Sequence, residues 1–112
     1  MAINGKRLVA GSQIAAAATT YYTAPTATRA QIQSMTLTNT TAGAVTATVH
    51  LVPSGGTATA SNTILSAKSI AAGESYRCIE AIGQWLEAAG TIQALASAAT
   101  SISLIASGIE QS

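Results

Sequence analysis

The sequence has very few of the groups that acid–base or metal chemistry requires. Its 112 residues include no Asp, one His and one Cys, and only 8% are Asp, Glu, Lys or Arg, whereas a typical domain has about a quarter. Catalytic and metal sites gather several such side chains in one place. We therefore expect a protein that is not an enzyme, with no catalytic residue, no metal site and no cofactor.

Scarcity of cysteine and of clustered basic residues excludes further classes. A single Cys78 rules out an internal disulfide, and because it lies in a strand-like run we expect a buried, unreactive thiol. Nucleic-acid binding needs a dense basic stripe, and among five basic residues only Lys6 and Arg7 are adjacent. No apolar run reaches eighteen residues, so we expect no membrane span. Neither nucleic acid nor membrane is an expected partner.

What the sequence does contain is an apolar/hydroxyl alternation with a period of two. In the segment 44–52 the apolar residues fall on one face, and threonines and His50 fall on the other. Such alternation is typical of a strand with one buried face. It predicts that His50 points away from the core and is an exposed surface histidine.

The same pattern recurs along the chain at the spacing of an all-β protein. In the segment 31–39 it changes phase between Ile32 and Met35, which predicts a β-bulge. We predict an all-β fold: an antiparallel β-sandwich of about eight strands, either jelly-roll or immunoglobulin-like. The predicted strands span residues 6–10, 19–23, 31–39, 44–52, 63–70, 75–79, 91–96 and 101–107.

Three segments outside these strands carry specific expectations. The small, polar loop 53–62 is predicted to cross between the sheets or to project from one end. The segment 80–87 is predicted to be a corner in which Trp85 or Leu86 plugs the sandwich. Asn39-Thr40-Thr41 fits the N-glycosylation pattern, which we interpret as a chance match in a Thr-rich chain.

We divide the chain into residues 1–12, an N-terminal arm with the first strand, and residues 13–112, a single β-sandwich domain. The arm is a candidate for docking or strand exchange. Tyr21 and Tyr22 are adjacent, so one is expected in the core and the other outward. The candidate interface residues are Ile3, Leu8, Tyr21, Tyr22 and Trp85.

Four stretches resemble a known group of proteins: LTNTT at 37–41, LVPSGG at 51–56, AAGESY at 71–76 and LEAAGTIQALAS at 86–97. Over most of the chain, from Lys6 to Glu110, the sequence is similar to small β-rich proteins encoded among the structural genes of tailed bacteriophages. The resemblance implies a virion component, made in the bacterial host cytoplasm. It rests on turns and strands, so it transfers no functional residue.

Together these observations predict a non-enzymatic structural protein, attached to the capsid exterior as a decoration or cement protein. Its expected partners are other copies of itself, with a trimer favoured, and the major capsid protein or other virion proteins. Two alternatives remain open. One is a tail fibre, adaptor or baseplate subunit; the other is a carbohydrate-binding module that stacks a glycan on Tyr21, Tyr22 or Trp85.

Overall fold

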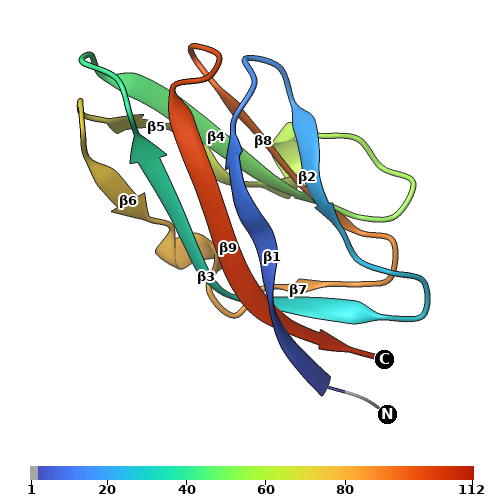
Figure 1. Ribbon diagram of the computed structural model, residues 1–112. Helices are drawn as coiled ribbons and strands as arrows, with labels where there is room; N and C mark the ends of the chain where they lie inside the picture. Colours follow the sequence, from blue (N-terminus) through green and yellow to red (C-terminus); the bar gives the residue numbers. More distant parts are fainter. Residues whose placement is uncertain (1–2) are drawn as a thin grey trace.

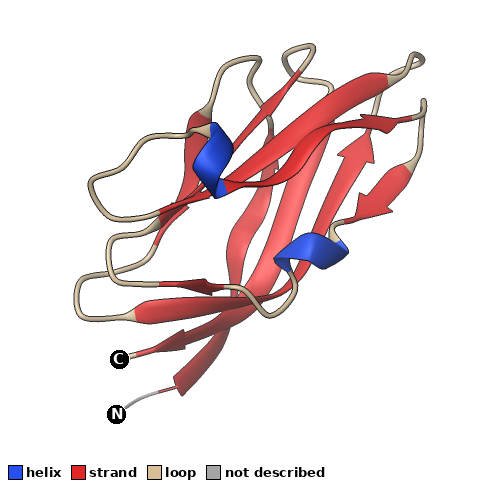
Figure 2. Ribbon diagram, turned by 180° about the vertical axis from the view of Figure 1, so that it is seen from behind, coloured by secondary structure: helices blue, strands red, loops and turns tan. Residues whose placement is uncertain are grey.

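A computed structural model describes residues 3–112 and gives nine β-strands and two short 3₁₀ turns (Figures 1 and 2). The 3₁₀ turns are η1 (Ala60–Asn62), in the loop after the fourth strand, and η2 (Ile79–Ala81), after the sixth. The strands are β1 (Ile3–Gln13), β2 (Thr19–Thr23), β3 (Arg29–Asn39), β4 (Val45–Val52), β5 (Thr63–Ile70), β6 (Ser75–Arg77), β7 (Trp85–Leu86), β8 (Thr91–Ala96) and β9 (Ile102–Gln111).

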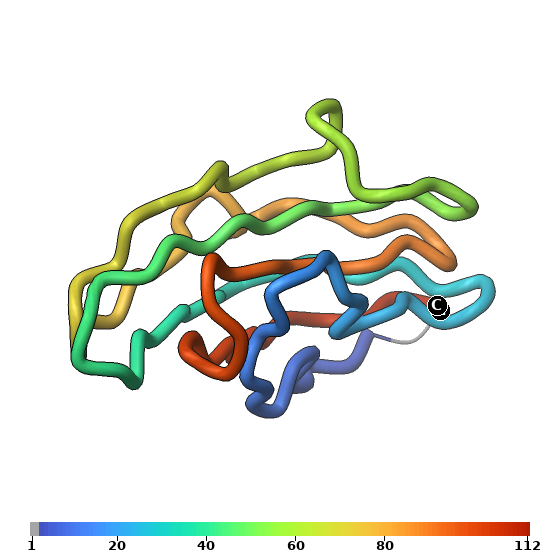
Figure 3. The backbone as a smooth tube through the Cα atoms, turned by 90° about the horizontal axis from the view of Figure 1, so that it is seen from above, coloured from blue at the N-terminus to red at the C-terminus, as the bar shows by residue number. Residues whose placement is uncertain are grey.

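The strands form two antiparallel sheets packed face to face, which confirms the predicted all-β sandwich. One sheet has the order β1-β9-β3-β6, with β7 also pairing with β3, and the other has the order β2-β8-β4-β5. Figure 3 shows the two layers, with β4 and β5 in one and β1, β3 and β9 in the other. Successive strands cross from layer to layer except at β4–β5 and β6–β7. This strand order is that of a jelly roll, which decides between the two predicted topologies.

The core consists of the small and branched aliphatic side chains that the composition requires. Alternate residues of each strand face it, because successive strand residues point to opposite sides of the sheet. Alanines on β4, β8 and β9 are fully buried there, which lets the two sheets approach closely. The largest fully buried aliphatic side chains are Ile14, Ile32, Met35, Leu37, Ile92, Ile102 and Leu104.

The predicted bulge in β3 is confirmed. In the pairing of β3 with β9 the register shifts between Ile32 and Ser34, so both Ile32 and Met35 face the core. Gly108 on β9 lies opposite Ile32, and a Cβ at this glycine would stand 1.9 Å from the Gln31 backbone oxygen. Only glycine therefore allows the two strands to approach this closely at the bulge.

The N-terminal segment belongs to the five-stranded sheet as far as the structure describes it. Strand β1 pairs with β9 from Ile3 to Gln13 and forms one edge of the sheet, and the predicted boundary between residues 12 and 13 falls inside it. Residues 1–2 of the predicted arm lie outside the described residues. A role of the arm in docking or strand exchange stays a prediction.

Candidate interaction surfaces

The five candidate interface residues lie in different parts of the fold. Leu8 and Tyr22 are buried in the core, and Tyr21 packs partly against it while its hydroxyl accepts a hydrogen bond from the Ala15 N–H. Ile3 is 60% exposed and Trp85 is 38% exposed. The structure thus leaves two of the five well exposed, and an interface role of the set stays a prediction.

The segment after β6 behaves as the predicted corner. Leu86 is buried and pairs with Ala30, whereas Trp85 pairs with Gln31 and points to the opposite side of the sheet. Leu86 is therefore the plug. The guanidinium of Arg29 lies 4.6 Å from the centre of the Trp85 ring, which is cation–π distance.

Two hydrogen-bonded groups of ionisable residues lie at the margins of the sandwich. Tyr22 on β2 donates to the Glu110 carboxylate on β9, and Lys6 lies 3.5 Å from the same carboxylate. Burial, together with the bond to Glu110, raises the pKa of Tyr22. This contact joins the two sheets and fixes a largely buried carboxylate, which is a structural arrangement.

The second group surrounds Cys78. Tyr76 donates to Glu80 at 2.9 Å, and Lys68 lies 5.1 Å from the centre of the Tyr76 ring. Hydrogen bonds from the Glu80 backbone N–H and from Tyr76 hold the pKa of the Glu80 carboxyl below its usual value. Burial raises the pKa of the Cys78 thiol to about 11. The thiol is fully buried and protonated at neutral pH, as predicted for an unreactive cysteine.

Within residues 3–112, no three His, Cys, Asp or Glu side chains are grouped so that they could hold a metal ion. Helices in that part of the chain do not reach the length and apolarity of a membrane span. The two outer faces of the sandwich differ in charge.

The outer face of the five-stranded sheet carries three exposed arginines. On β9 the core-facing residues are Leu104, Ala106 and Gly108, so the residues that alternate with them face outward. Residues of the neighbouring strands that lie directly opposite these outward residues face the same side. On this outward side, Ser107 lies opposite Arg7 and Gln111 lies opposite Arg29. Ile105 lies opposite Thr36, and Thr36 in turn lies opposite Arg77. We call this surface the arginine face.

The arginine face also exposes large apolar side chains and has no acid. Ile105 is 44% exposed near the centre of the face, and Ile3 and Trp85 lie toward the end of the sheet where β9 ends (Figure 1). The four glutamates lie elsewhere: Glu74 in the β5–β6 turn, Glu80 in η2, Glu87 after β7, and Glu110 on the inward side of β9. Within residues 3–112 the one salt bridge is Lys6–Glu110, so none of the three arginines has a carboxylate partner there.

Among the described residues 3–112, the outward positions of the four-stranded sheet carry no formal charge; Lys68 of β5 lies opposite the inward-facing Ala47. The outward residues of this sheet include the pairs Thr20–Gln93, Thr23–Thr91 and Thr46–Ser69. We call this outer surface the threonine face. The loop 53–62 does not cross between the sheets, because β4 and β5 are neighbours in one sheet. It rises away from β4 in Figure 3 and then folds back over the threonine face at His50.

The prediction that His50 is exposed is wrong. His50 does point away from the core, in register with Gln93, but it is only 7% exposed. Its Nδ1 lies 3.1 Å from the Thr59 carbonyl oxygen and 3.1 Å from Asn62 Oδ1. Both are acceptors, so Nδ1 carries the proton and donates. The chain's own loop, held by the histidine, replaces solvent on this face.

The glycosylation-like triplet has a structural explanation. Asn39 is fully buried; its amide donates to the carbonyl oxygens of Gly43 and Ile70, and its Oδ1 accepts from the Thr41 N–H. Asn39 therefore holds the β3–β4 turn together. A buried amide with these bonds is closed to modification in the folded chain.

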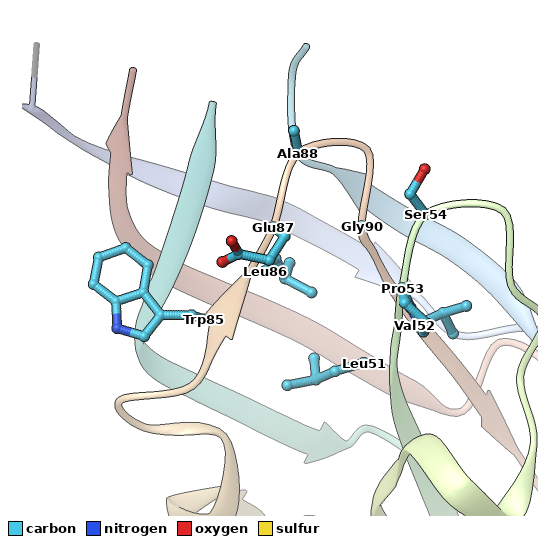
Figure 4. A pocket seen from close by; sticks show the side chains of 9 residues that line it. All are labelled: Leu51, Val52, Pro53, Ser54, Trp85, Leu86, Glu87, Ala88 and Gly90. Atoms are coloured by element: carbon cyan, nitrogen blue, oxygen red, sulfur yellow. The ribbon is translucent and has the colours of Figure 1, made fainter. Parts of the chain in front are cut away.

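A pocket of about 190 Å³ lies at one end of the sandwich, between the end of β4 and the β7–β8 connection (Figure 4). Leu51, Pro53 and Leu86 give it a mostly apolar lining, and Glu87 also lines it. Figure 4 shows the Trp85 ring turned away from the other lining side chains. The pocket thus lacks the exposed aromatic floor that sugar stacking requires.

No protein-family model matches the chain, and no curated protein matches it in sequence. Among solved structures, a chain in the structure of infectious bursal disease virus, Gx strain, is similar with a TM-score of 0.42 and 18% identity. The match covers 97% of this chain and 30% of that chain, so this chain spans less than a third of its neighbour's length. A similarity this low carries no inference about function.

Proposed function

We propose that this chain is a non-enzymatic structural protein of a tailed-phage virion, attached to the capsid exterior as a decoration or cement protein. The observation that carries the proposal is the placement of charge. Among residues 3–112, neither outer face of the jelly roll carries a glutamate: the glutamates lie at turns, edges and ends, one face consists mainly of Thr, Ser and Gln, and the other carries three arginines beside Ile3, Ile105 and Trp85. Such faces suit packing against neighbouring proteins, because the threonine face has few charges to desolvate and the arginine face combines charge of one sign with exposed apolar side chains.

The proposed mechanism is the burial of apolar area at junctions between shell subunits. Each square ångström of apolar surface removed from water contributes about 25 cal/mol. Ile3, Ile105 and Trp85 are the exposed side chains of the arginine face that would contribute most. A modest footprint repeated many times over a shell strengthens it, and the resemblance to phage structural proteins supports the same assignment.

Immunogold electron microscopy tests the location. Purified antibodies against this chain are applied to intact phage particles released by the bacterium that encodes it. Label over the outside of the heads is the expected result. Label confined to tails would support the fibre, adaptor or baseplate alternative, and particles without label would overturn a virion role.

Light scattering tests the self-association that belongs to this proposal. We expect an oligomer, with a trimer of about three times the 11.1 kDa chain mass favoured. A monomer at millimolar concentration would contradict self-association in solution. For the carbohydrate alternative, binding on a glycan array that is lost in Trp85→Ala would replace the structural proposal.

A further inference from the structure

The uncompensated arginines indicate what the chain binds. Arg29 lies opposite Gln111 and Arg7 opposite Ser107, four residues apart along β9, or roughly 13 Å at about 3.3 Å per residue. Arg7 on β1 and Arg77 on β6 lie three strand spacings apart, about 14 Å. Arg77 lies opposite Thr36, seven residues along β3 from Arg29, or roughly 23 Å at about 3.3 Å per residue. The three side chains therefore cannot all converge on one small anion, and a ligand that engages all three must present several anionic groups over an extended surface.

The residues between the arginines give the partner its second property. Ile105 lies near the middle of the face and Trp85 lies beside Arg29, and both are substantially exposed. Tryptophan and arginine are the residue types that dominate binding energy in protein interfaces. Apolar side chains between separated cations favour a protein surface over a nucleic-acid backbone, where cations lie in a dense stripe.

A second copy of the same face is excluded as the partner by charge. Two arginine faces packed together would oppose six guanidinium groups with no carboxylate between them, and like charges in an interface are strongly unfavourable. We propose that the arginine face is the docking surface of this chain and that its partner is a protein surface presenting several carboxylates around an apolar patch. This inference rests on the proposed function, since the partner is taken to be a neighbouring protein of the particle.

A charge-matched pair of variants isolates the face. Arg7→Ala, Arg29→Ala and Arg77→Ala together change the net charge from +1 to −2 (+1 − 3). Thr20→Glu, Thr23→Glu and Ser69→Glu together also give −2 (+1 − 3), but place the change on the threonine face, at exposed side chains. The two variants feel the same net repulsion from an acidic probe, so any difference between them belongs to the arginine face.

Poly-L-glutamate at low ionic strength is the probe, and Trp85 is the reporter because it is the single tryptophan of the chain and lies on the face. We expect the polymer to protect Trp85 of the wild type from acrylamide quenching. The arginine variant should bind at least tenfold more weakly than its charge-matched control. Equal affinity of the two variants, or tighter binding of the wild type to duplex DNA than to poly-L-glutamate, would overturn the inference.

Folding controls and a second set of substitutions make the binding result interpretable. Circular dichroism and thermal unfolding verify folding, and a version with glutamine at the three arginine positions, close to the original side-chain length, replaces the alanine variant if that one misfolds. A chain absent from particles that still binds poly-L-glutamate through its arginines would overturn the proposed function and keep the docking face. If the chain is present on phage heads but the arginine variant attaches as well as the wild type, the proposed function is kept and the docking face is overturned.

Discussion

The two outer faces of this jelly roll have the same strand geometry but opposite relations to the rest of the chain. The arginine face is bare: its cations have no carboxylate partner among residues 3–112, and Ile105 and Trp85 stand in solvent. The threonine face has no formal charge within residues 3–112 and is partly covered by the loop 53–62, which His50 holds in place. One face is left open to other molecules, while the other is partly closed by the chain itself.

The comparison shows that the alternation of apolar and polar residues determines to which side of the sheet a side chain points. It does not determine whether another segment of the chain covers that side chain. His50 and Arg7 both point outward from their sheets. A ten-residue segment of small polar residues covers the first, and no such segment covers the second. Removing His50 should therefore affect folding, and removing Arg7 should affect only binding. Substitutions on the two sheets can test this division.

The largest loss of stability is expected from Gly108→Ala, which disrupts the close approach of β9 to β3 at the bulge. A Cβ there would overlap the Gln31 backbone oxygen, and backbone cannot move aside as a flexible side chain can. We expect a loss of more than about 3 kcal/mol in the free energy of unfolding, measured by urea denaturation.

Gly5→Ala is the matched control for Gly108→Ala. Gly5 lies in the same sheet, and a Cβ there has nothing within 4 Å. Its free energy of unfolding should stay within about 0.5 kcal/mol of the wild type. Wild-type stability of Gly108→Ala would show that β3 and β9 do not pair in this register.

A smaller effect is expected from His50→Ala on the threonine face. The substitution removes the donor to Thr59 and Asn62 and opens a space beneath the loop, so we expect a loss of about 1–3 kcal/mol in urea denaturation. Limited proteolysis should cleave the loop 53–62 faster. Arg7→Ala on the bare face should change stability by less than about 0.5 kcal/mol. Equal losses in the free energy of unfolding for His50→Ala and Arg7→Ala would contradict the view that the loop covers one face and leaves the other open.

Much of the fold could be predicted from the sequence because apolar core residues alternate with polar outward residues along the strands. The segments 19–23, 63–70 and 91–96 were predicted with the bounds that the structure gives. The β3 bulge was also predicted, since Ile32 and Met35 cannot both face inward in a regular strand. Strand order depends on contacts between distant segments, so the choice between jelly-roll and immunoglobulin-like topology needed the structure.

The candidate surface was harder to predict for the same reason. Trp85 was identified because exposed aromatics are rare in this chain, but β7, which orients it, has two residues and no detectable period. Arg7, Arg29 and Arg77 are scattered in sequence and come to one face only through the pairing of β1, β9, β3 and β6. A search for adjacent basic residues finds Arg7 beside Lys6 but does not group it with Arg29 and Arg77. The burial of His50 likewise depends on a loop whose sequence has no apolar signal.

A change smaller than those of Gly108→Ala and His50→Ala, and opposite in sign, is expected at the free edge of the four-stranded sheet. Ala67 on β5 has a φ of 45°, in the left-handed region, and its N–H donates to Thr48 Oγ1 at 2.9 Å where the pairing of β4 with β5 is irregular. An irregular edge strand is a poor template for pairing with another chain. The alanine Cβ makes this conformation costly, whereas glycine adopts it freely.

We expect Ala67→Gly to raise the free energy of unfolding by about 0.5–1 kcal/mol in urea denaturation, because the relief of strain exceeds the entropy that glycine adds to the unfolded chain. Ala10→Gly is the matched control: Ala10 is an exposed alanine of the edge strand β1 without a positive φ, and its substitution should lose about 0.5–1 kcal/mol. Opposite signs at two exposed edge alanines would locate strain at the β5 irregularity. A loss at Ala67 as large as at Ala10 would show that the left-handed conformation of Ala67 stores no strain.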